Sequence, residues 1–397
     1  MENKIKTVVP TLRFPEFRGT EGWIFKSLDS LVKMRKGEQV NKSILRDQGL
    51  YPVINGGIAP SGYYDYYNTD ANTITISEGG NSCGYVSYIT SRFWCGGHCF
   101  AVIVQKEINA KYIYHLLKRH EYNIMQLRVG SGLPNIQYSD LRKYSVFSTS
   151  IYKEQQKIAD CLSSLDDLIE ATTKKVEALK EHKKGLMQRL FPAKGKNVPD
   201  LRFPEFQGTS VWEEKKLGKI GNFIGGGTPN TTNPEYWDGE ILWYTPTEIK
   251  NGYLKSSNRK ITKQGLKNSS AKLLPKGAIL ITTRATIGDV AISKKECTTN
   301  QGFQSLVVND SEINLFWFYW IIQHKEELIK KASGSTFKEI GKNEIINIIA
   351  YSAKKQEQQK IADCLSSIDE LIEATTRKIE VLKEHKKGLM QQLFPKI

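Results

Sequence analysis

The sequence has no apolar run long enough to cross a bilayer. Its longest apolar stretches, such as residues 315–322, are much shorter than the roughly 20 residues that a membrane-spanning helix needs. The first residues also lack the apolar segment of a secretory signal peptide. Six cysteines among 397 residues suit a reducing compartment better than a disulfide framework. These absences exclude a membrane protein and predict a cytoplasmic location.

A complete catalytic or cofactor-binding motif is also missing. Gly225-Gly-Gly227 is not followed by the Gly-Lys-Ser/Thr of a phosphate-binding loop. Asn233-Pro-Glu-Tyr236 resembles the Asn-Pro-Pro-Tyr loop of amino-methyltransferases but lacks its second proline. The acids at residues 200 and 213–214 mimic a metal-dependent nuclease signature, yet the matching positions in the first half of the chain are not acidic. We therefore predict no catalytic residue and no cofactor in this chain.

One set of residues in the first half of the chain has side-chain types that can bind a metal. It consists of Cys83, Cys95, His98 and Cys99. Their spacing does not contain the paired Cys-x-x-Cys that is typical of structural zinc sites. We predict that the chain binds no metal.

An internal duplication is the main feature that is present. Residues 154–192 recur as residues 357–395 at an offset of 203, with only six positions changed. A shorter motif, Leu-Arg-Phe-Pro-Glu-Phe, occupies residues 12–17 and recurs at residues 201–206, at an offset of 189. A repeat of this length implies duplicated domains rather than a solenoid.

The duplication divides the chain into two modules in tandem, each with the short motif, a divergent middle and a shared tail. We predict an α+β protein in which two globular domains alternate with two long helices. The expected bounds are residues 1–152 and 193–355 for the domains, and residues 153–192 and 356–397 for the helices.

The net charge of +15 lies outside the repeated tails. Residues 154–192 carry seven acids and seven bases, and residues 357–395 carry seven acids and six bases, so the tails sum to −1 and the remainder to +16. Basic charge confined to the divergent domains indicates that they contact a polyanion. A generally basic surface is the alternative, but it does not explain this partition.

Each repeated tail carries a heptad stripe that predicts one strand of a coiled coil. The expected seam is Ile158, Leu162, Leu165, Ile169, Val176 and Leu179 in the first copy and Ile361, Leu365, Ile368, Ile372, Ile379 and Leu382 in the second. Both helices are acidic in their first half and basic in their second. Antiparallel pairing therefore sets acids against bases, which favours that direction over the parallel one.

Antiparallel pairing predicts a dumbbell with pseudo-two-fold symmetry. About 33 residues at 1.5 Å each give a stalk of roughly 50 Å, which corresponds to about 15 base pairs at 3.4 Å per step. We expect two basic domains at that separation to read two half-sites on one duplex.

Both globular domains combine strand-like runs with a helix near the end. In the second domain, residues 277–283 and 289–293 predict strands around a polar loop, and residues 315–331 predict a helix. In the first, residues 74–86 stand in place of that loop and residues 112–127 predict the helix. A shared scaffold with different loops is what two readers of different sequences require.

The most specific motifs are the Glu-Gln-Gln-Lys-Ile-Ala-Asp-Cys-Leu start of each repeated helix and residues 226–237, 283–288 and 333–336. With them, the whole chain resembles the specificity subunit of a type I restriction-modification enzyme. The resemblance implies two target-recognition domains, one for each half of a bipartite, asymmetric double-stranded DNA site with an unspecific spacer. It also implies that the helices hold two methyltransferase (modification) subunits, joined by restriction (motor) subunits. S-adenosylmethionine, ATP and magnesium are then expected on those partners.

The resemblance also indicates where DNA contacts are expected. In the second domain these residues are Thr228, Tyr236, Trp237, Arg284, Thr286, Gln301, Ser333, Ser335 and Lys338, and in the first they are Asn81, Ser82, Arg128, Ser131 and Asn135. Tyr63 and Tyr64 are added because their rings can stack on bases or sugars, and packing against the core is the alternative for such an aromatic run. The first domain departs from the family pattern because Glu78-Gly-Gly80 stands where the second has Thr283-Arg284.

Two other classes of protein are compatible with parts of this pattern. A self-contained restriction nuclease or methyltransferase with duplicated DNA-binding domains would need an intact catalytic motif, which the sequence lacks. A coiled-coil adaptor that does not bind DNA predicts neutral domains, whereas these are basic. The sequence therefore favours a non-catalytic subunit that recognises DNA and assembles partners.

Overall fold

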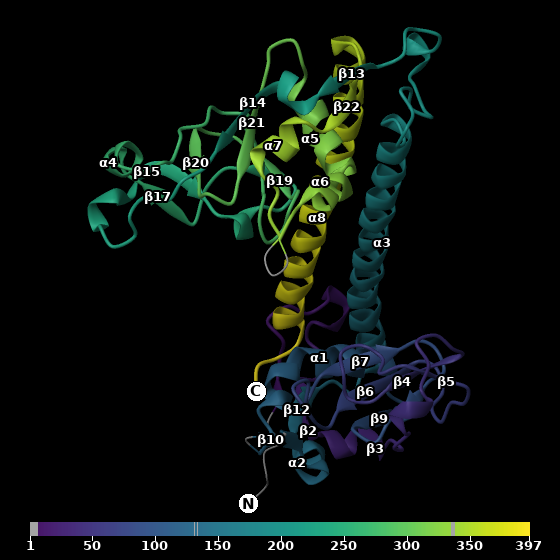
Figure 1. The fold of residues 1–397 in the computed structure, drawn as a ribbon. Helices are drawn as coiled ribbons and strands as arrows, with labels where there is room; N and C mark the ends of the chain where they lie inside the picture. The colour runs from purple at the N-terminus through teal and green to yellow at the C-terminus, as the bar shows by residue number, and fades with distance from the viewer. Residues whose placement is uncertain (1–6, 131, 133, 335–337) are drawn as a thin grey trace, which may run out of the picture. The chain divides into compact units, whose positions relative to one another are not determined.

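The structure, a computed structural model, describes residues 7–130, 132, 134–334 and 338–397. By compactness the chain divides into unit 1, the described residues up to Lys174 together with Thr376–Ile397, and unit 2, Lys175–Thr375. Each unit contains half of each long helix, α3 (Tyr152–Leu190) and α8 (Lys355–Leu393) (Figure 1). We call the rest of each unit its head. The domain bounds expected from the sequence stay a prediction.

Head 1 is built on a four-stranded antiparallel sheet in the order β3-β9-β6-β7. Its strands are β3 (Val32–Lys36), β6 (Thr73–Ser77), β7 (Val86–Ile89) and β9 (Cys99–Val104). The smaller sheets contain β1 (Thr7–Val8), β2 (Trp23–Ser27) and β12 (Ser145–Ser148); β4 (Tyr51–Ile54), β5 (Tyr63–Tyr64) and β8 (Trp94–Cys95); and the hairpin of β10 (Arg128–Val129) and β11 (Asn135–Ile136). The helices are α1 (Ala110–Met125) and α2 (Tyr138–Lys143).

Head 2 has a five-stranded sheet in the order β14-β21-β18-β19-β16. Its strands are β14 (Gly221–Gly225), β16 (Gly252–Leu254), β18 (Ile279–Ile281), β19 (Val290–Ser293) and β21 (Gln304–Val308). The smaller sheets pair β13 (Glu213–Lys216) with β22 (Ile349–Ser352), and β15 (Trp237–Tyr244) with β17 (Arg259–Ile261) and β20 (Cys297–Thr299). The helices are α4 (Lys263–Lys267), α5 (Asn314–Gln323), α6 (Lys325–Lys331) and α7 (Lys342–Ile346).

The two heads share one topology although their sequences diverge. Both place a hairpin of equivalent strands, β6–β7 and β18–β19, beside the strand that precedes the helix, β9 or β21. Both also contain an equivalent short parallel pair, β4 with β8 and β15 with β20. Head 2 has a further parallel pair, β16 with β19. The expected common scaffold, an α+β fold used twice, is confirmed.

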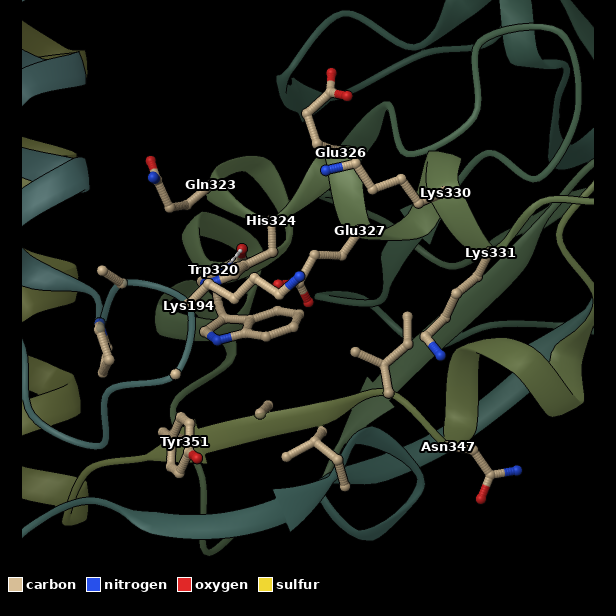
Figure 2. A pocket seen from close by; sticks show the side chains of 16 residues that line it. Lys194, Trp320, Gln323, His324, Glu326, Glu327, Lys330, Lys331, Asn347 and Tyr351 are labelled. Carbon is tan, nitrogen blue, oxygen red and sulfur yellow. Dashed lines mark hydrogen bonds between the residues drawn. The ribbon is translucent and has the colours of Figure 1, made fainter.

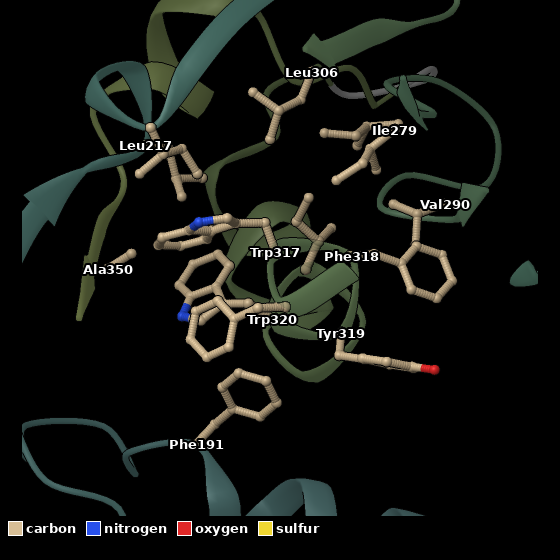
Figure 3. Close-up of a cluster of buried hydrophobic side chains, with 14 of the residues drawn as sticks. Phe191, Leu217, Ile279, Val290, Leu306, Trp317, Phe318, Tyr319, Trp320 and Ala350 are labelled. Atoms are coloured by element: carbon tan, nitrogen blue, oxygen red, sulfur yellow. The ribbon is translucent and has the colours of Figure 1, made fainter. Parts of the chain in front are cut away.

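The core of unit 2 is formed around α5, which is apolar on all sides. Residues 316–321 of this helix are each at most 4% exposed, as expected for a helix that has no polar face to give to water. Figure 3 shows Trp317 and Trp320 of α5 in one cluster with Phe191, which follows the end of α3 and packs on Phe316 of α5 at 5.2 Å between ring centroids. The head and the end of the long helix thus share one core, which fixes the head on the helix.

The predicted helix over residues 315–331 is two helices in the structure. His324 interrupts it with φ −105° and ψ 19°, and its ring stacks on Trp320 at 4.1 Å between centroids. The break ends α5 at Gln323 and starts α6 at Lys325, because His324 leaves helical backbone geometry. Hydrophobic patterning does not reveal such a break.

Within unit 1, the halves of α3 and α8 run antiparallel. Lys386 of α8 forms an ion pair with Asp166 of α3. Nearer the start of α3, Leu162 lies in the same buried cluster as Leu393 near the end of α8. Residues closer to the start of α3 therefore contact residues closer to the end of α8, as in an antiparallel pair.

Unit 2 repeats this arrangement with the other halves. Lys183 of α3 donates to both carboxylate oxygens of Asp369 at 2.6 and 2.7 Å, and the Tyr319 hydroxyl donates to Asp369 at 2.7 Å. Leu190, at the end of α3, shares a buried cluster with Ile361, near the start of α8. Within each unit, the antiparallel pairing expected from the charges is confirmed.

The residues expected at the seam face inward in both helices. Ile158, Leu162, Val176, Ile361, Leu365 and Ile379 are buried, and Leu165, Ile169, Leu179, Ile368, Ile372 and Leu382 are half-buried. The earliest residues of each stripe also pack into a head, since Ile158 shares a cluster with Trp23 and Ile361 shares one with Trp212. The first apolar residues of each stripe therefore pack against a head as well as against the other long helix.

The short Leu-Arg-Phe-Pro-Glu-Phe motif, which we call the arm, joins the two long helices within each unit. In unit 1 its contacts are Arg13 Nε to Glu154 (2.7 Å), Glu16 to Lys157 (3.0 Å) and the Leu12 amide to the Gln392 carbonyl (3.0 Å). In unit 2 the equivalent contacts are Arg202 to Glu357 (2.6 Å), Glu205 to Lys360 (3.1 Å) and Leu201 to Arg189 (2.8 Å). Each arm thus fastens the start of one long helix to the end of the other.

Candidate nucleic-acid interface

Four loops of head 2 meet in one surface. The Thr283 amide donates to the Gly302 carbonyl at 2.8 Å, and the Thr283 carbonyl accepts from the Ile340 amide at 3.2 Å. The Gly227 amide donates to the Thr299 carbonyl at 2.8 Å. These bonds join residues 226–228, 282–288, 300–303 and the described part of 332–340, which together we call loop surface 2.

Arg284 lies on loop surface 2 and is paired with Glu339. Its Nε is 2.8 Å from Glu339 Oε1, and the two side chains are 49% and 43% exposed. Backbone bridges join Glu339 to Arg284 and to Ser333. A pocket of about 760 Å³ beside this pair is also lined by Thr286 and Lys338. The structure thus brings together four of the predicted contact residues, while Ser335 lies outside the described residues.

The loop that carries Arg284 is held in one conformation by local hydrogen bonds. Ala285 has a φ of 57°, which is a strained backbone for a residue with a side chain. The Thr282 hydroxyl donates to the Thr286 carbonyl at 2.5 Å, and the Asp289 amide donates to the same hydroxyl at 3.1 Å. Lys325 donates to the Asp289 carboxylate at 2.6 Å. These contacts offset the strain and preorganise the loop.

Thr228 and Gln301 form a second part of loop surface 2. The Thr228 hydroxyl donates to Gln301 Oε1 at 2.6 Å, and the pair is exposed. The preceding glycines let the loops approach closely, because a Cβ on Gly226 would lie 1.9 Å from the Asn300 carbonyl. The Trp243 indole fixes this loop by donating to the Gly227 carbonyl at 2.9 Å.

Trp237 and Tyr236 are placed differently from the other predicted contacts. Trp237 is 5% exposed, lies edge-on to Trp243 at 5.0 Å and is covered by the Arg259 guanidinium at 3.5 Å. Tyr236 is half-buried against the same small core. The structure therefore uses Trp237 for packing and does not bring it to loop surface 2. An aromatic residue in a polar motif does not reveal by sequence which of the two roles it has.

Head 1 repeats the hydrogen bonds that define loop surface 2. The Glu78 amide donates to the His98 carbonyl at 2.9 Å, and the Glu78 carbonyl accepts from the Ile136 amide at 2.9 Å. These bonds make Glu78 equivalent to Thr283. The adjoining backbone bridge joins Gly79 to Asn135, so that these two residues occupy the places of Arg284 and Glu339. The framework is the same and the charged pair is absent.

The predicted contacts of head 1 fall into two groups. Asn81 and Ser82 lie on the loop after β6, where Ser82 donates to the Gly56 carbonyl at 2.5 Å, and Arg128 and Asn135 lie on the neighbouring β10–β11 hairpin. Ser131 lies outside the described residues. Tyr63 and Tyr64 are half-buried on β5 in the smaller sheet, where Tyr64 packs edge-on to Trp94 at 5.2 Å.

The cysteines of head 1 are buried and bonded to backbone. The Cys83 thiol donates to the Glu78 carbonyl at 2.8 Å, and burial raises its pKa. Cys95 and Cys99 are also buried. Among the described residues, no group of three or more His, Cys, Asp or Glu side chains is arranged to hold a metal ion. In the same part of the chain, no helix is both long and apolar enough to cross a membrane.

A further cavity of head 2, of about 630 Å³, shares no residue with the pocket beside Arg284. Figure 2 shows it lined by Trp320 and His324 on one side and Tyr351 on another. Its lining includes three lysines (Lys194, Lys330, Lys331) and two glutamates (Glu326, Glu327). This mixture of charges gives the cavity no clear preference for an anion.

Sequence reasoning missed the residues that support the contact loops. Glu339, Thr282 and the Asp289–Lys325 pair act through other side chains. Their only sequence signal is polarity next to a glycine-rich loop, and that signal is not specific. Their partners are set by the fold.

Comparison with known proteins agrees with this geometry. The family model for the type I restriction modification DNA specificity domain matches residues 20–181 and again residues 209–384. The specificity subunit of the type I restriction enzyme MjaIX from Methanocaldococcus jannaschii is 37% identical over 201 residues, which is 48% of this chain and 46% of that protein. The chain thus matches about half the length of that relative.

Two further comparisons extend over nearly the whole chain. A type I specificity subunit from Mycoplasma genitalium is 25% identical over 378 residues and 94% of each chain. The crystal structure of a type I restriction-modification S subunit from M. genitalium aligns with a TM-score of 0.69 at 23% identity, covering 98% of this chain and all of that one. That likeness supports the fold.

Two equivalent heads on paired helices, each matched by the same DNA specificity domain, define a two-domain DNA-recognition protein. The chain belongs to the type I restriction-modification specificity subunit family. Such a subunit is the non-catalytic component of a type I enzyme.

Proposed function

We propose that the chain reads a bipartite, asymmetric DNA site, with head 1 on one half-site and head 2 on the other. The observation that carries this proposal is the shared loop framework with different residues at its tip. Arg284 and Glu339 in head 2 are replaced by Gly79 and Asn135 in head 1. Two copies of one framework with unlike tips suit two unlike half-sites.

The charge distribution supports DNA as the partner of the heads. The residues outside the repeated tails carry +16, and cationic side chains supply most of the sequence-independent affinity for a duplex. Loop surface 2 adds Arg284, Thr286 and Lys338 around one pocket. Arginine and threonine side chains are both used to contact base edges in the major groove.

The long helices, in this proposal, hold two methyltransferase subunits and, with them, the restriction subunits. Leu168 on α3 and Leu371 on α8 occupy equivalent repeat positions and are 42% and 43% exposed. A single exposed leucine needs no explanation, but the same one in both copies supports two equal sites for two equal partners. S-adenosylmethionine, ATP and magnesium belong to those partners, and the assembly works in the cytoplasm.

Methylome sequencing of cells that carry this chain with its partner subunits tests the proposal. We expect one bipartite modified sequence with two unlike halves. Arg284→Ala should relax one base position in one half only, because a lost arginine contact to a base edge removes about 1–3 kcal/mol of discrimination. A modified sequence that is continuous, or relaxation in both halves, would contradict the assignment of one head to each half-site.

A further inference from the structure

The charge of Arg284 is neutralised before any DNA arrives. Its Nε lies 2.8 Å from Glu339 Oε1. An arginine that only attracts phosphate would bind it better without a carboxylate beside it. We propose that Glu339 is a positioning residue that gives head 2 a preference for guanine at the base opposite Arg284. The proposal rests on the proposed function of head 2 as a DNA reader.

The backbone holds both members of the pair in place. Residues 284 and 339 form an antiparallel bridge, and Glu339 forms a second bridge with Ser333. The amide of the next residue, Ile340, is bonded to the Thr283 carbonyl at 3.2 Å. Since Ala285 adopts its strained φ of 57° only because the loop around it is fixed, the guanidinium starts from a defined position. Its freedom to follow a phosphate is reduced.

Contact through Nε suits recognition of guanine. The terminal Nη1 and Nη2 groups of an arginine match the O6 and N7 acceptors of guanine in the major groove. An arginine steered through Nε can present these terminal groups end-on. Of the four bases, only guanine offers two acceptors side by side at that edge, so that a held guanidinium discriminates better than a mobile one.

The carboxylate also acts against wrong sequences. A negative charge close to the DNA is repelled by phosphates unless the arginine beside it makes a compensating contact. Glu339 therefore lowers the affinity for any duplex that lacks the matching base. Arg284 without this carboxylate would not discriminate against such a duplex in this way. Head 1 lacks this device, because Gly79 and Asn135 stand at the equivalent positions.

The test uses the full chain assembled with its methyltransferase subunits. Selection from a randomised duplex library gives the base preference at each position, and titration with a random-sequence duplex at several salt concentrations gives the non-specific affinity. The variants are Glu339→Gln and Arg284→Ala. Asp29→Asn is the matched control, since it removes one carboxylate from an arginine pair of similar exposure, Arg142–Asp29 in head 1, outside loop surface 2.

We expect Glu339→Gln to weaken the preference for guanine at one position by roughly 5- to 150-fold. The same variant should bind the random duplex more tightly, with a salt dependence steeper by about one unit, because one more cation is free to contact a phosphate. Arg284→Ala should lose the same preference without gaining non-specific affinity. Glu339→Asp, which keeps the charge but shortens the side chain, should lose preference and keep the original salt dependence.

The outcomes separate this inference from the function on which it rests. If Arg284→Ala changes one position while Glu339→Gln behaves like wild type and Asp29→Asn, the DNA-reading role stands and the role of Glu339 is overturned. A preference at that position for a base other than guanine also overturns it. If the wild-type complex selects no sequence, both the inference and the proposed function fail.

Discussion

The duplicated arm contact predicts that two chemically identical substitutions will have unequal costs. Glu154 of α3 accepts from Arg13 at 2.7 and 2.8 Å, from the Thr149 hydroxyl at 2.8 Å and from the Trp23 indole at 3.3 Å. Its repeat equivalent, Glu357 of α8, accepts from Arg202 at 2.8 and 2.6 Å.

The difference arises from the head that surrounds each glutamate. Ala353 stands where unit 1 has Thr149, since the carbonyl of each accepts from the equivalent glutamine, Gln358 or Gln155. Trp212, the counterpart of Trp23, has no hydrogen-bond partner for its indole nitrogen among the described residues. Glu154 therefore has two stabilising contacts beyond the arginine. Among the described residues, Arg202 is the side chain that donates hydrogen bonds to Glu357.

The expected magnitudes follow from burial. The side chains of Arg13 and Glu154 are 4% and 1% exposed, and those of Arg202 and Glu357 are 9% and 3% exposed. Removing one member of a buried ion pair costs about 3–5 kcal/mol because the other charge is left without compensation. We expect about 3 kcal/mol for Glu357→Gln. Glu154→Gln should cost about 5 kcal/mol, since two further bonds of about 1 kcal/mol each are also weakened.

Thermal unfolding of the full chain measures this difference, and hydrogen exchange of the amides shows which unit is affected. At about 2–4 °C per kcal/mol for units of this size, Glu154→Gln should lower the Tm by about 4–8 °C more than Glu357→Gln. Glu16→Gln and Glu205→Gln, which break the exposed arm contacts to Lys157 and Lys360, are the controls and should leave the Tm unchanged. Equal losses for Glu154→Gln and Glu357→Gln, or losses no larger than those of the controls, would refute the reasoning.

Two further predictions concern acid stability and assembly. Burial lowers the pKa of His115 to about 3 and of His120 to about 4, below the ordinary value of about 6.5, so the unfolded chain takes up their protons first as the pH falls. Their contribution to the free energy of unfolding is therefore fully present above about pH 6.5. At pH 5 the free energy of unfolding should be lower by about 2 kcal/mol for each histidine. His115→Tyr copies Tyr319, which stands at the equivalent position in unit 2 and donates to Asp369. This variant should remove about half of the acid-induced loss of stability, as measured by the Tm across a range of pH. An unchanged pH dependence of the Tm would contradict the prediction. Leu168→Asp with Leu371→Asp should prevent copurification of the methyltransferase subunit without lowering the Tm, and retained copurification would show that this face is not the docking site.

The duplication and the heptad stripes make much of this protein predictable from its sequence. The heptad periodicity correctly predicts which face of each long helix is buried. The charge asymmetry of each repeated helix correctly predicts antiparallel pairing within the units, because that direction sets acids against bases. The short motif and the helix repeat were also visible. Their contact was not, since Arg13 and Glu154 are 141 residues apart and no periodic signal links them.

The candidate interface depended more heavily on the tertiary structure. Arg284 was predicted from its motif, but its partner Glu339 is brought to it by a bridge between two loops that the sequence does not connect. Trp237 was expected at the surface and is buried beneath Arg259. The sequence by itself determined the repeated frame, because helix pairing follows a pattern that neighbouring residues carry. Only the tertiary structure decided which loop side chains meet, because contacts between loops depend on how the strands beneath them are ordered.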